Sequence, residues 1–210
     1  MNRIITISRQ FGSGGREIGR RVAEELGLAY YDQEIVSELS ERTAYTKEYL
    51  QEIDQIDPLP LMPITIAQSF AQTIDPISEM NHDIFQRQSE LILELAERSD
   101  CVIVGRAADY LLRDKQQLFR LFIVADDDFK LKRCLEKGEV DGERNTKQLQ
   151  RDIKKVDKRR ARFYEFYTHQ TWGDPINYDL VINTSRLGIR RAVELIKQVI
   201  KQWDPPVQSE

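Results

Sequence analysis

The sequence is poor in the side chains that carry most acid–base, thiol and metal chemistry. Its 210 residues include only two histidines, His82 and His169, and two cysteines, Cys101 and Cys134. Each histidine is interpreted more simply as an ordinary polar residue than as a catalyst. The two cysteines match no metal-ligand or redox spacing, so we expect reduced, buried or half-buried thiols in a cytoplasmic protein.

A long hydrophobic run is also lacking. No stretch of about 18 apolar residues occurs, so we expect no membrane-spanning helix. The chain runs directly from its first residues into the strand-like segment Ile4-Ile5-Thr6-Ile7, so we expect no signal peptide. Hydrophobic residues make up 40% of the sequence and charged residues 31%, which is typical of one soluble globular domain of this length.

The net charge of −4 combines two segments of opposite sign. Residues 32–100 contain fifteen acidic and four basic residues, whereas residues 144–162 contain nine basic and two acidic residues. An acidic protein with one local basic stretch is not typical of a general nucleic-acid binder. The basic stretch suits a compact polyanion such as a nucleotide phosphate, although a solvated helix face would have the same composition.

Short apolar runs alternate with helix-like segments along the chain. The predicted strands are residues 4–7, 28–31, 101–104, 118–125 and 178–182, and helices are expected after Gly15 and from Ile189 to Trp203. Short β-branched runs without polar alternation are typical of strands that are buried on both faces of a parallel sheet. The order predicts an α/β fold, a doubly wound parallel sheet between two helical layers.

Two helix-prone segments interrupt this alternation. The first, about 33–88, is acidic and contains four prolines, and the second, about 137–172, is basic. We interpret them as insertions into a single domain whose core is about 1–32, 89–136 and 173–203, with a short tail at 204–210. Ligands of such sheets bind at the carboxyl ends of the strands, so Gly12–Arg16, Asp32, Gly105-Arg106 and Asn183–Ser185 are expected to converge there.

A glycine cluster, Gly12, Gly14 and Gly15, lies between the first predicted strand and helix. Glycine lets a backbone turn tightly and direct its N–H groups at an anion, and the start of a helix adds partial positive charge. The segment therefore predicts a phosphate site, or else a plain strand-to-helix turn. Aligned with the P-loop pattern G-x-x-x-x-G-K-[ST], Gln10 replaces the first glycine, Arg16 the lysine and Glu17 the hydroxyl residue.

Several motifs together resemble the cytidylate kinase-like family. They are Ile7-Ser8-Arg9-Gln10-Phe11-Gly12-Ser13-Gly14-Gly15, Tyr30-Tyr31-Asp32, Val102-Ile103-Val104-Gly105-Arg106-Ala107, Asp157-Lys158-Arg159-Arg160 and Trp172-Gly173-Asp174. The resemblance implies a P-loop fold of the nucleoside monophosphate kinase type, with 33–88 as the acceptor-binding insertion and 137–172 as a lid. It implies that Arg106 holds the acceptor phosphate and that Arg160 is a lid arginine. The implied substrates are ATP with Mg²⁺ and a nucleoside monophosphate, CMP or dCMP first.

Phosphoryl transfer to a monophosphate depends on positioning and on charge neutralisation, and arginine binds phosphate oxygens in pairs. We therefore predict that Arg16, Arg151 and Arg160 act in catalysis, and that the glycines, Ser13, Arg16 and Arg133 bind the cofactor. Ser13 is also a candidate Mg²⁺ ligand, because Glu17 occupies the usual hydroxyl position. Asp32 is predicted to orient the acceptor or Mg²⁺-bound water, or to cap the next helix.

Three functions remain open from the sequence. The first is an ATP-dependent kinase for CMP or dCMP. The second is a nucleotide-binding protein of the same fold with little or no turnover, which the absence of the P-loop lysine would favour. The third is a kinase for another small metabolite, which the unusual 33–88 segment would permit. In each case we expect nucleotides as partners, neither nucleic acid nor membrane, and leave homo-oligomerisation open.

Overall fold

A computed structural model of the chain describes residues 2–52, 76–137 and 146–203. Its five strands are β1 (Ile4–Arg9), β2 (Ala29–Tyr31), β3 (Cys101–Val104), β4 (Leu118–Val124) and β5 (Leu180–Asn183). All pair in parallel, in the order β2-β3-β1-β4-β5. The predicted doubly wound parallel sheet is confirmed, and each predicted strand lies within two residues of an observed one.

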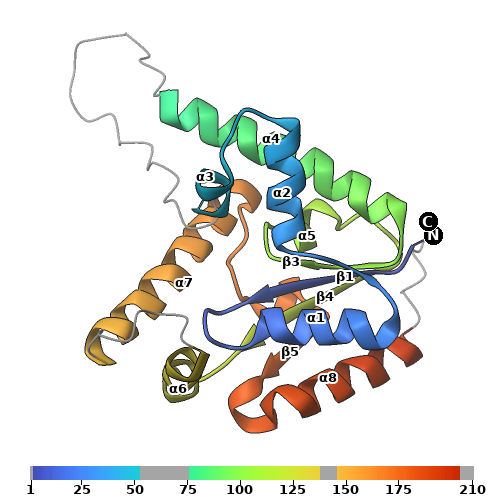
Figure 1. Cartoon of the computed structure of the whole chain (residues 1–210). Coiled ribbons are helices and arrows are strands. Elements are labelled where there is room, and N and C mark those ends of the chain that lie inside the picture. Colours follow the sequence, from blue (N-terminus) through green and yellow to red (C-terminus); the bar gives the residue numbers. More distant parts are fainter. Residues whose placement is uncertain (1, 53–75, 138–145, 204–210) are drawn as a thin grey trace.

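Helices cover both faces of this sheet (Figure 1). They are α1 (Gly15–Leu26), α2 (Gln33–Arg42), α3 (Lys47–Glu52), α4 (Pro76–Arg98), α5 (Ala108–Leu111), α6 (Asp127–Lys137), α7 (Thr146–Thr168) and α8 (Thr184–Gln202), with a 3₁₀ turn at Pro175–Asn177. Helices α1 and α8 pack on one face, and α2 and α4 on the other. No described helix is long and apolar enough to cross a membrane.

Successive side chains along the central strands point to opposite faces of the sheet, so the core has two parts. On β1, Ile4 belongs to the cluster beneath α2 and α4, whereas Ile5 and Ile7 belong to the cluster beneath α1 and α8. On β3, Ile103 and Val104 divide in the same way. Because both faces are buried, the strands need apolar side chains at successive positions, which is why they read as continuous runs in the sequence.

The predicted boundary between insertion and core, at residues 88/89, falls inside α4. Ile84 on one side of this position and Leu91 and Leu95 on the other belong to the same buried cluster. The helix therefore continues through the boundary, because its apolar side chains face one core on both sides. Residues 53–75, which contain three of the four prolines of the predicted insertion, lie outside the described residues, as does the tail at 204–210.

Helix α7 provides the described part of the predicted lid. Near its start, Leu149 and Ile153 pack against Cys134 of α6 and the ring of Phe11. Towards its end, Phe163 and Tyr164 pack with Ala107, which follows β3. The helix thus spans the carboxyl ends of the central strands from α6 to α4 (Figure 1).

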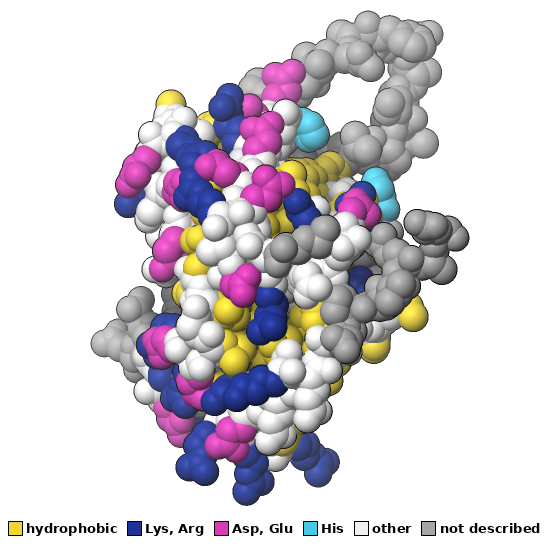
Figure 2. Space-filling model, turned by 90° about the vertical axis from the view of Figure 1, so that its right-hand side faces the viewer, with side chains coloured by type: hydrophobic (Ala, Val, Ile, Leu, Met, Phe, Trp, Pro, Cys, Tyr) yellow, Lys and Arg dark blue, Asp and Glu magenta, His cyan; other side chains and the backbone are white. Residues whose placement is uncertain are grey.

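The surface seen from the right-hand side of Figure 1 mixes charges of both signs (Figure 2). Many pairs are local, such as Glu94 with Arg98, and Arg42 joins Glu38 of its own helix to Glu94 of α4. Exposed pairs of this kind contribute little to stability. Within the described part of the chain, acidic side chains on α2 and α4 thus have basic partners at the surface.

A buried polar network joins α7 to the sheet. The carboxylate of Asp109 accepts hydrogen bonds from the Ser8 hydroxyl at 3.2 Å and from the Tyr164 hydroxyl at 2.7 Å. Asp109 is 3% exposed. Burial raises the pKa of its carboxyl, and the bonds from Tyr164 and Ser8 offset this only in part.

This network predicts a pH dependence of stability. A folded-state pKa above the unfolded value of about 3.9 means that the folded protein holds the proton more tightly, so the free energy of unfolding falls as pH rises from about 4 through the raised pKa. Asp109→Asn removes this contribution. We expect the variant to gain stability relative to the wild type as pH rises from about 4 to about 7, measured by urea unfolding at several pH values.

Asp114→Asn, which changes an exposed carboxyl outside the network, is the matched control. Its unfolding free energy should run parallel to that of the wild type over this range. Parallel curves for Asp109→Asn as well would show that burial does not perturb the Asp109 carboxyl in the folded protein.

Candidate functional site

The loop between β1 and α1 has a conformation that requires glycine. Gly12 has a φ of 73°, and Gly14 has a φ of 86° at the N-cap of α1. A Cβ atom at Gly14 would also lie 2.2 Å from Cδ1 of Ile189. Residues with a side chain rarely adopt these angles, and here the space is filled as well. Gly14 is therefore needed both for the turn and for the approach of α8.

A cavity of about 280 Å³ lies over this loop, and we call it the loop cavity. It is lined by Arg9, Gln10, Phe11, Gly12, Gly14, Gly15, Arg16, Arg133 and Arg160. The first N–H groups of α1 have no acceptor within the helix, and they carry the partial positive charge of its dipole. Three glycines, four arginines and a helix start therefore surround one space, which is the chemistry that a phosphate requires.

Ser13, which was predicted to bind phosphate or Mg²⁺, does not line this cavity. Its side chain is fully buried, and its hydroxyl donates to the Gln10 carbonyl at 2.8 Å. Its own carbonyl accepts from the Thr184 hydroxyl at 2.8 Å. This placement speaks against a ligand role: the hydroxyl closes the turn, and the carbonyl ties the loop to Thr184 at the start of α8.

Glu17 gathers cations beside the loop. Its carboxylate lies 2.8 Å from Nη2 of Arg133 and 3.5 Å from Nζ of Lys137, both on α6, and 2.6 Å from Arg21. Burial alone would raise the pKa of Glu17, but the hydrogen bond and charge of Arg133, with the charges of Lys137 and Arg21, hold it below its ordinary value. Arg133 is thereby held over the loop, with Nε 3.5 Å from where a Gly14 Cβ would be.

Asp32 has a corresponding role at the end of β2. One carboxylate oxygen lies 2.9 Å from Nε of Arg16, and the other lies 3.9 Å from Nη2 of Arg9. The carboxylate makes no capping hydrogen bond to α2, although Asp32 occupies the N-cap position. Of the two interpretations in the sequence, the helix cap is not observed, and orientation of the acceptor or of Mg²⁺-bound water stays a prediction. In the structure Asp32 pairs with Arg16.

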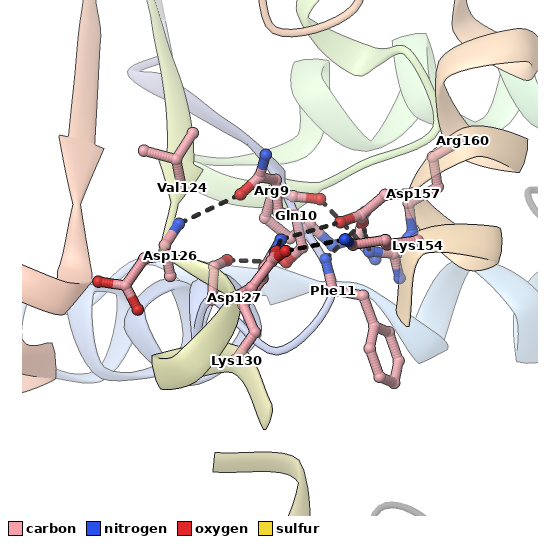
Figure 3. Close-up of polar contacts among 12 residues, drawn as sticks. Arg9, Gln10, Phe11, Val124, Asp126, Asp127, Lys130, Lys154, Asp157 and Arg160 are labelled. Atoms are coloured by element: carbon pink, nitrogen blue, oxygen red, sulfur yellow. Dashed lines mark hydrogen bonds and ion pairs between the residues drawn. The ribbon is translucent and has the colours of Figure 1, made fainter. Parts of the chain in front are cut away.

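Asp157 on α7 attaches the predicted lid to the loop (Figure 3). Its carboxylate accepts a hydrogen bond from the Phe11 N–H at 2.6 Å. It also lies 3.8 Å from both Arg160 and the buried ammonium of Lys130, which pairs with Asp127 at 3.0 Å. Burial raises the pKa of Asp157 more than these contacts lower it. In the sequence Asp157 is marked only by a family motif, and no sequence pattern indicates Lys130.

A second cavity, of about 20 Å³, lies behind the first at the end of β3, and we call it the inner cavity. It is lined by Ser8, Arg9, Gly105, Arg106, Ala107, Arg160, Phe163, Tyr164 and Trp172. Arg9 and Arg160 line both cavities. The two spaces therefore adjoin, with one guanidinium from β1 and one from α7 at their junction.

Arg106 stands in a strained turn. Gly105, Arg106 and Ala107 all have φ between 53° and 77°, and the two non-glycine positions cost about 1–3 kcal/mol each. The buried Arg106 guanidinium donates to the Gln88 side-chain oxygen of α4. Strain of this kind persists where the surrounding structure fixes it, and such positions concentrate at functional sites.

The four aromatic residues near the end of α7 divide by position. Phe163 and Tyr164 line the inner cavity, whereas Tyr167 stacks on Phe85 of α4 with ring centroids 3.8 Å apart, and Phe166 is 42% exposed. The stack joins the lid helix to the predicted acceptor-binding segment. His82 and His169 line neither cavity, in agreement with their interpretation as ordinary polar residues.

Arg151 is the one predicted catalytic arginine that the structure places elsewhere. It is exposed, and it lines neither cavity. Nine residues separate it from Arg160, which on a helix with 3.6 residues per turn places the two side chains on opposite faces. The predicted role of Arg151 at the phosphates is therefore not supported by its position.

The predicted convergence of the strand ends is confirmed. Arg16 contacts Asp32, the Arg9 side chain reaches Gly105, and Thr184 is bonded to the loop. The sequence did not indicate Arg9 as a site residue, because Arg9 ends a buried strand whose other residues are mostly apolar. Only its position as the last residue before the glycine loop could have singled it out.

The residues present fit ATP at the loop cavity, because a glycine cradle, a helix start and Arg16, Arg133 and Arg160 face one space. Among the described residues no cluster of three metal-ligating side chains occurs. Mg²⁺ in kinases is held by the substrate phosphates with one or two carboxylates, and Asp32, which pairs with Arg16 at the start of α1, would be a candidate for this part.

Comparison with known proteins agrees with this geometry. The chain is 27% identical to a cytidylate kinase of Desulfurococcus amylolyticus over 93% of its own length and 91% of that protein. A structure of an uncharacterised protein from Eubacterium ventriosum has a TM-score of 0.70 at 27% identity, covering 96% of this chain and all of that one. A shikimate kinase from Bacteroides thetaiotaomicron, at 15% identity and a TM-score of 0.57 over 95% of this chain and 98% of its own, shares the fold. The cytidylate kinase-like family matches residues 4–186, and the chain belongs to this family.

Proposed function

We propose that the protein transfers the γ-phosphoryl group of ATP to a nucleoside monophosphate, with CMP or dCMP as the first candidates. The observation that carries the proposal is the junction of two cavities. One is a glycine-and-arginine space suited to a polyphosphate, and the other contains Arg106, suited to a single phosphate. Family membership supports a kinase in general, and the similar cytidylate kinase directs attention to cytosine nucleotides.

In this proposal the acceptor phosphate is the nucleophile, so no general base is needed. One of its oxygens forms a bond to the γ-phosphorus while the bond from that phosphorus to the β–γ bridging oxygen breaks, and the electron pair leaves on ADP. The protein positions the two substrates and neutralises charge. Arg133 and Arg16 would hold the donor phosphates, Arg106 the acceptor, and Arg160 would lie between them.

A second candidate is a kinase for a smaller hydroxylated acceptor. The observation that favours it is the size of the inner cavity, about 20 Å³, which holds about one water molecule. A nucleotide acceptor requires α7 to move away from α4, which would separate the stack of Phe85 and Tyr167. A small metabolite needs a smaller movement. The fold is compatible with both, since it is shared with a shikimate kinase.

The test is a screen of nucleoside monophosphates and small hydroxyl metabolites with ATP and Mg²⁺, followed by detection of ADP and of the phosphorylated product. Turnover of CMP above all other acceptors would support the first proposal, and turnover of a non-nucleotide hydroxyl the second. Binding of ATP without turnover of any acceptor would favour the nucleotide-binding protein that the replaced P-loop lysine suggests.

Removal of the Arg106 guanidinium should weaken use of the acceptor but not binding of ATP. We expect Arg106→Met to lower kcat/KM for the monophosphate at least about tenfold, since a charge-assisted contact to phosphate is worth about 1.5–3 kcal/mol. ATP affinity, measured by calorimetry, should remain nearly unchanged. Arg113→Met, at an exposed arginine near Tyr110, is the control. Loss of ATP binding in Arg106→Met would place the residue on the donor side instead.

The lid arginine is tested against its neighbour on the same helix. Arg160→Ala should lower kcat at least about tenfold, a barrier change of roughly 1.4 kcal/mol, with a smaller effect on ground-state binding. Arg159→Ala should have less effect, because adjacent side chains on a helix diverge by about 100°. Equal losses in both variants would mean that α7 contributes general positive charge rather than one positioned guanidinium.

A further inference from the structure

The Arg9 side chain occupies the space beneath the glycine loop. A Cβ at Gly15 would lie 2.5 Å from Cβ of Arg9, and a Cβ at Gly105 would lie 1.9 Å from its Nη1. The side chain therefore runs from the first residue of α1, across the end of β1, to the turn that carries Arg106. Two glycines, one in each half of the site, leave the room that this arginine fills.

Arg9 is also the last residue of β1, the strand that lies between β3 and β4 in the sheet. Its side chain is 8% exposed, and it lines both the loop cavity and the inner cavity. Its backbone carbonyl accepts a hydrogen bond from Arg160 at 3.3 Å. The Arg160 guanidinium of the lid helix thus contacts the backbone of Arg9, and both residues line the two cavities in which the donor and acceptor phosphates would lie.

The Arg16 side chain is paired with Asp32 in the structure. Arg16 stands at the lysine position of the pattern, but its side chain is 57% exposed and Nε lies 2.9 Å from Asp32. Asp32 also lies 3.5 Å from the Tyr30 hydroxyl. Arg9 contacts the other carboxylate oxygen at the longer distance of 3.9 Å. Asp32 is therefore balanced by Arg16, and Arg9 is not required merely to neutralise it.

We propose that Arg9 is a catalytic residue that contacts the γ-phosphoryl group in transfer and supplies the charge that a P-loop lysine supplies elsewhere. The inference rests on the proposed function and deepens it. The phosphoryl group moves from the β–γ bridging oxygen to an acceptor oxygen, and Arg9 keeps its protons throughout. A buried guanidinium is effective in this position because it is held in place before the substrates arrive, in a site of low dielectric.

The experiment compares the full-length wild type with Arg9→Met, Arg9→Lys, Asp32→Asn and the double variant Arg9→Met/Asp32→Asn. For each we measure kcat and KM with ATP and CMP, and the affinity for Mg²⁺-ADP with and without aluminium fluoride, which stands for the phosphoryl group in transfer. Arg9→Met should lower kcat about a hundredfold or more, change ADP affinity less than about threefold, and abolish the tighter binding in aluminium fluoride.

The double variant separates catalysis from charge balance. It removes both buried charges, so it carries no uncompensated carboxylate. Recovery of kcat and of the fluoride effect to the level of Asp32→Asn alone would overturn the proposal, because Arg9 would then only balance Asp32. An unchanged kcat in Arg9→Met would overturn it as well. If Arg9→Met does not fold, the double variant decides: a kcat at least tenfold below that of Asp32→Asn supports the proposal, and a kcat equal to it overturns the proposal. Arg9→Lys, which keeps the charge, should retain more of the wild-type kcat than a variant without it.

The same measurements distinguish this inference from the proposed function. A wild type that turns over no acceptor, yet binds ADP more tightly in aluminium fluoride and loses this effect in Arg9→Met, contradicts the kinase proposal and supports the contact of Arg9. Arg113→Met, at an exposed arginine outside both cavities, should match the wild type in all measurements.

Discussion

The site depends on the confinement of positive charge by carboxylates at the carboxyl ends of four parallel strands. Asp32 holds Arg16 and approaches Arg9, Glu17 holds Arg133, and Asp157 lies beside Arg160. Without these partners, several buried or half-buried guanidinium groups around one loop would repel each other and would be costly to remove from water. The carboxylates therefore make it possible to concentrate arginines at this edge before any phosphate binds.

The pairing of arginines with carboxylates also affects how a phosphate would bind in the proposed site. It enters a space in which each cation already has an anionic neighbour, so the gain from binding comes from geometry as well as from charge. Arginine suits this because one guanidinium can contact a carboxylate and a phosphate oxygen at the same time with different N–H groups. The acidic residues thus hold the cations of the proposed phosphate site in place, and Glu17 does so at a position where the usual P-loop carries a hydroxyl.

Helix α7 brings the two halves of the site together. Through Asp157 and Arg160 it contacts the loop, and through Tyr164 it joins the buried carboxylate of Asp109 beneath the inner cavity. Movement of this helix would change the loop, the Arg9–Arg160 contact and the inner cavity together. A coupled arrangement of this kind is what a lid requires if closure is to complete the site only when both substrates are present.

The sheet could be predicted from the sequence, because the apolar runs of buried parallel strands and the glycine turn after the first of them are local signals. The sequence also predicted that Gly12, Gly14, Gly15, Arg16, Asp32 and Arg106 would meet, since all follow strand ends. Which cations line the loop cavity depends on contacts between segments that are distant in the sequence. Ser13 is turned inward, Arg151 lies on the far face of α7, and α4 continues through the expected boundary, because each of these outcomes is set by packing against distant residues. Arg9 became visible as part of the site only where Gly15 and Gly105, 90 residues apart in the chain, leave room for one side chain between them.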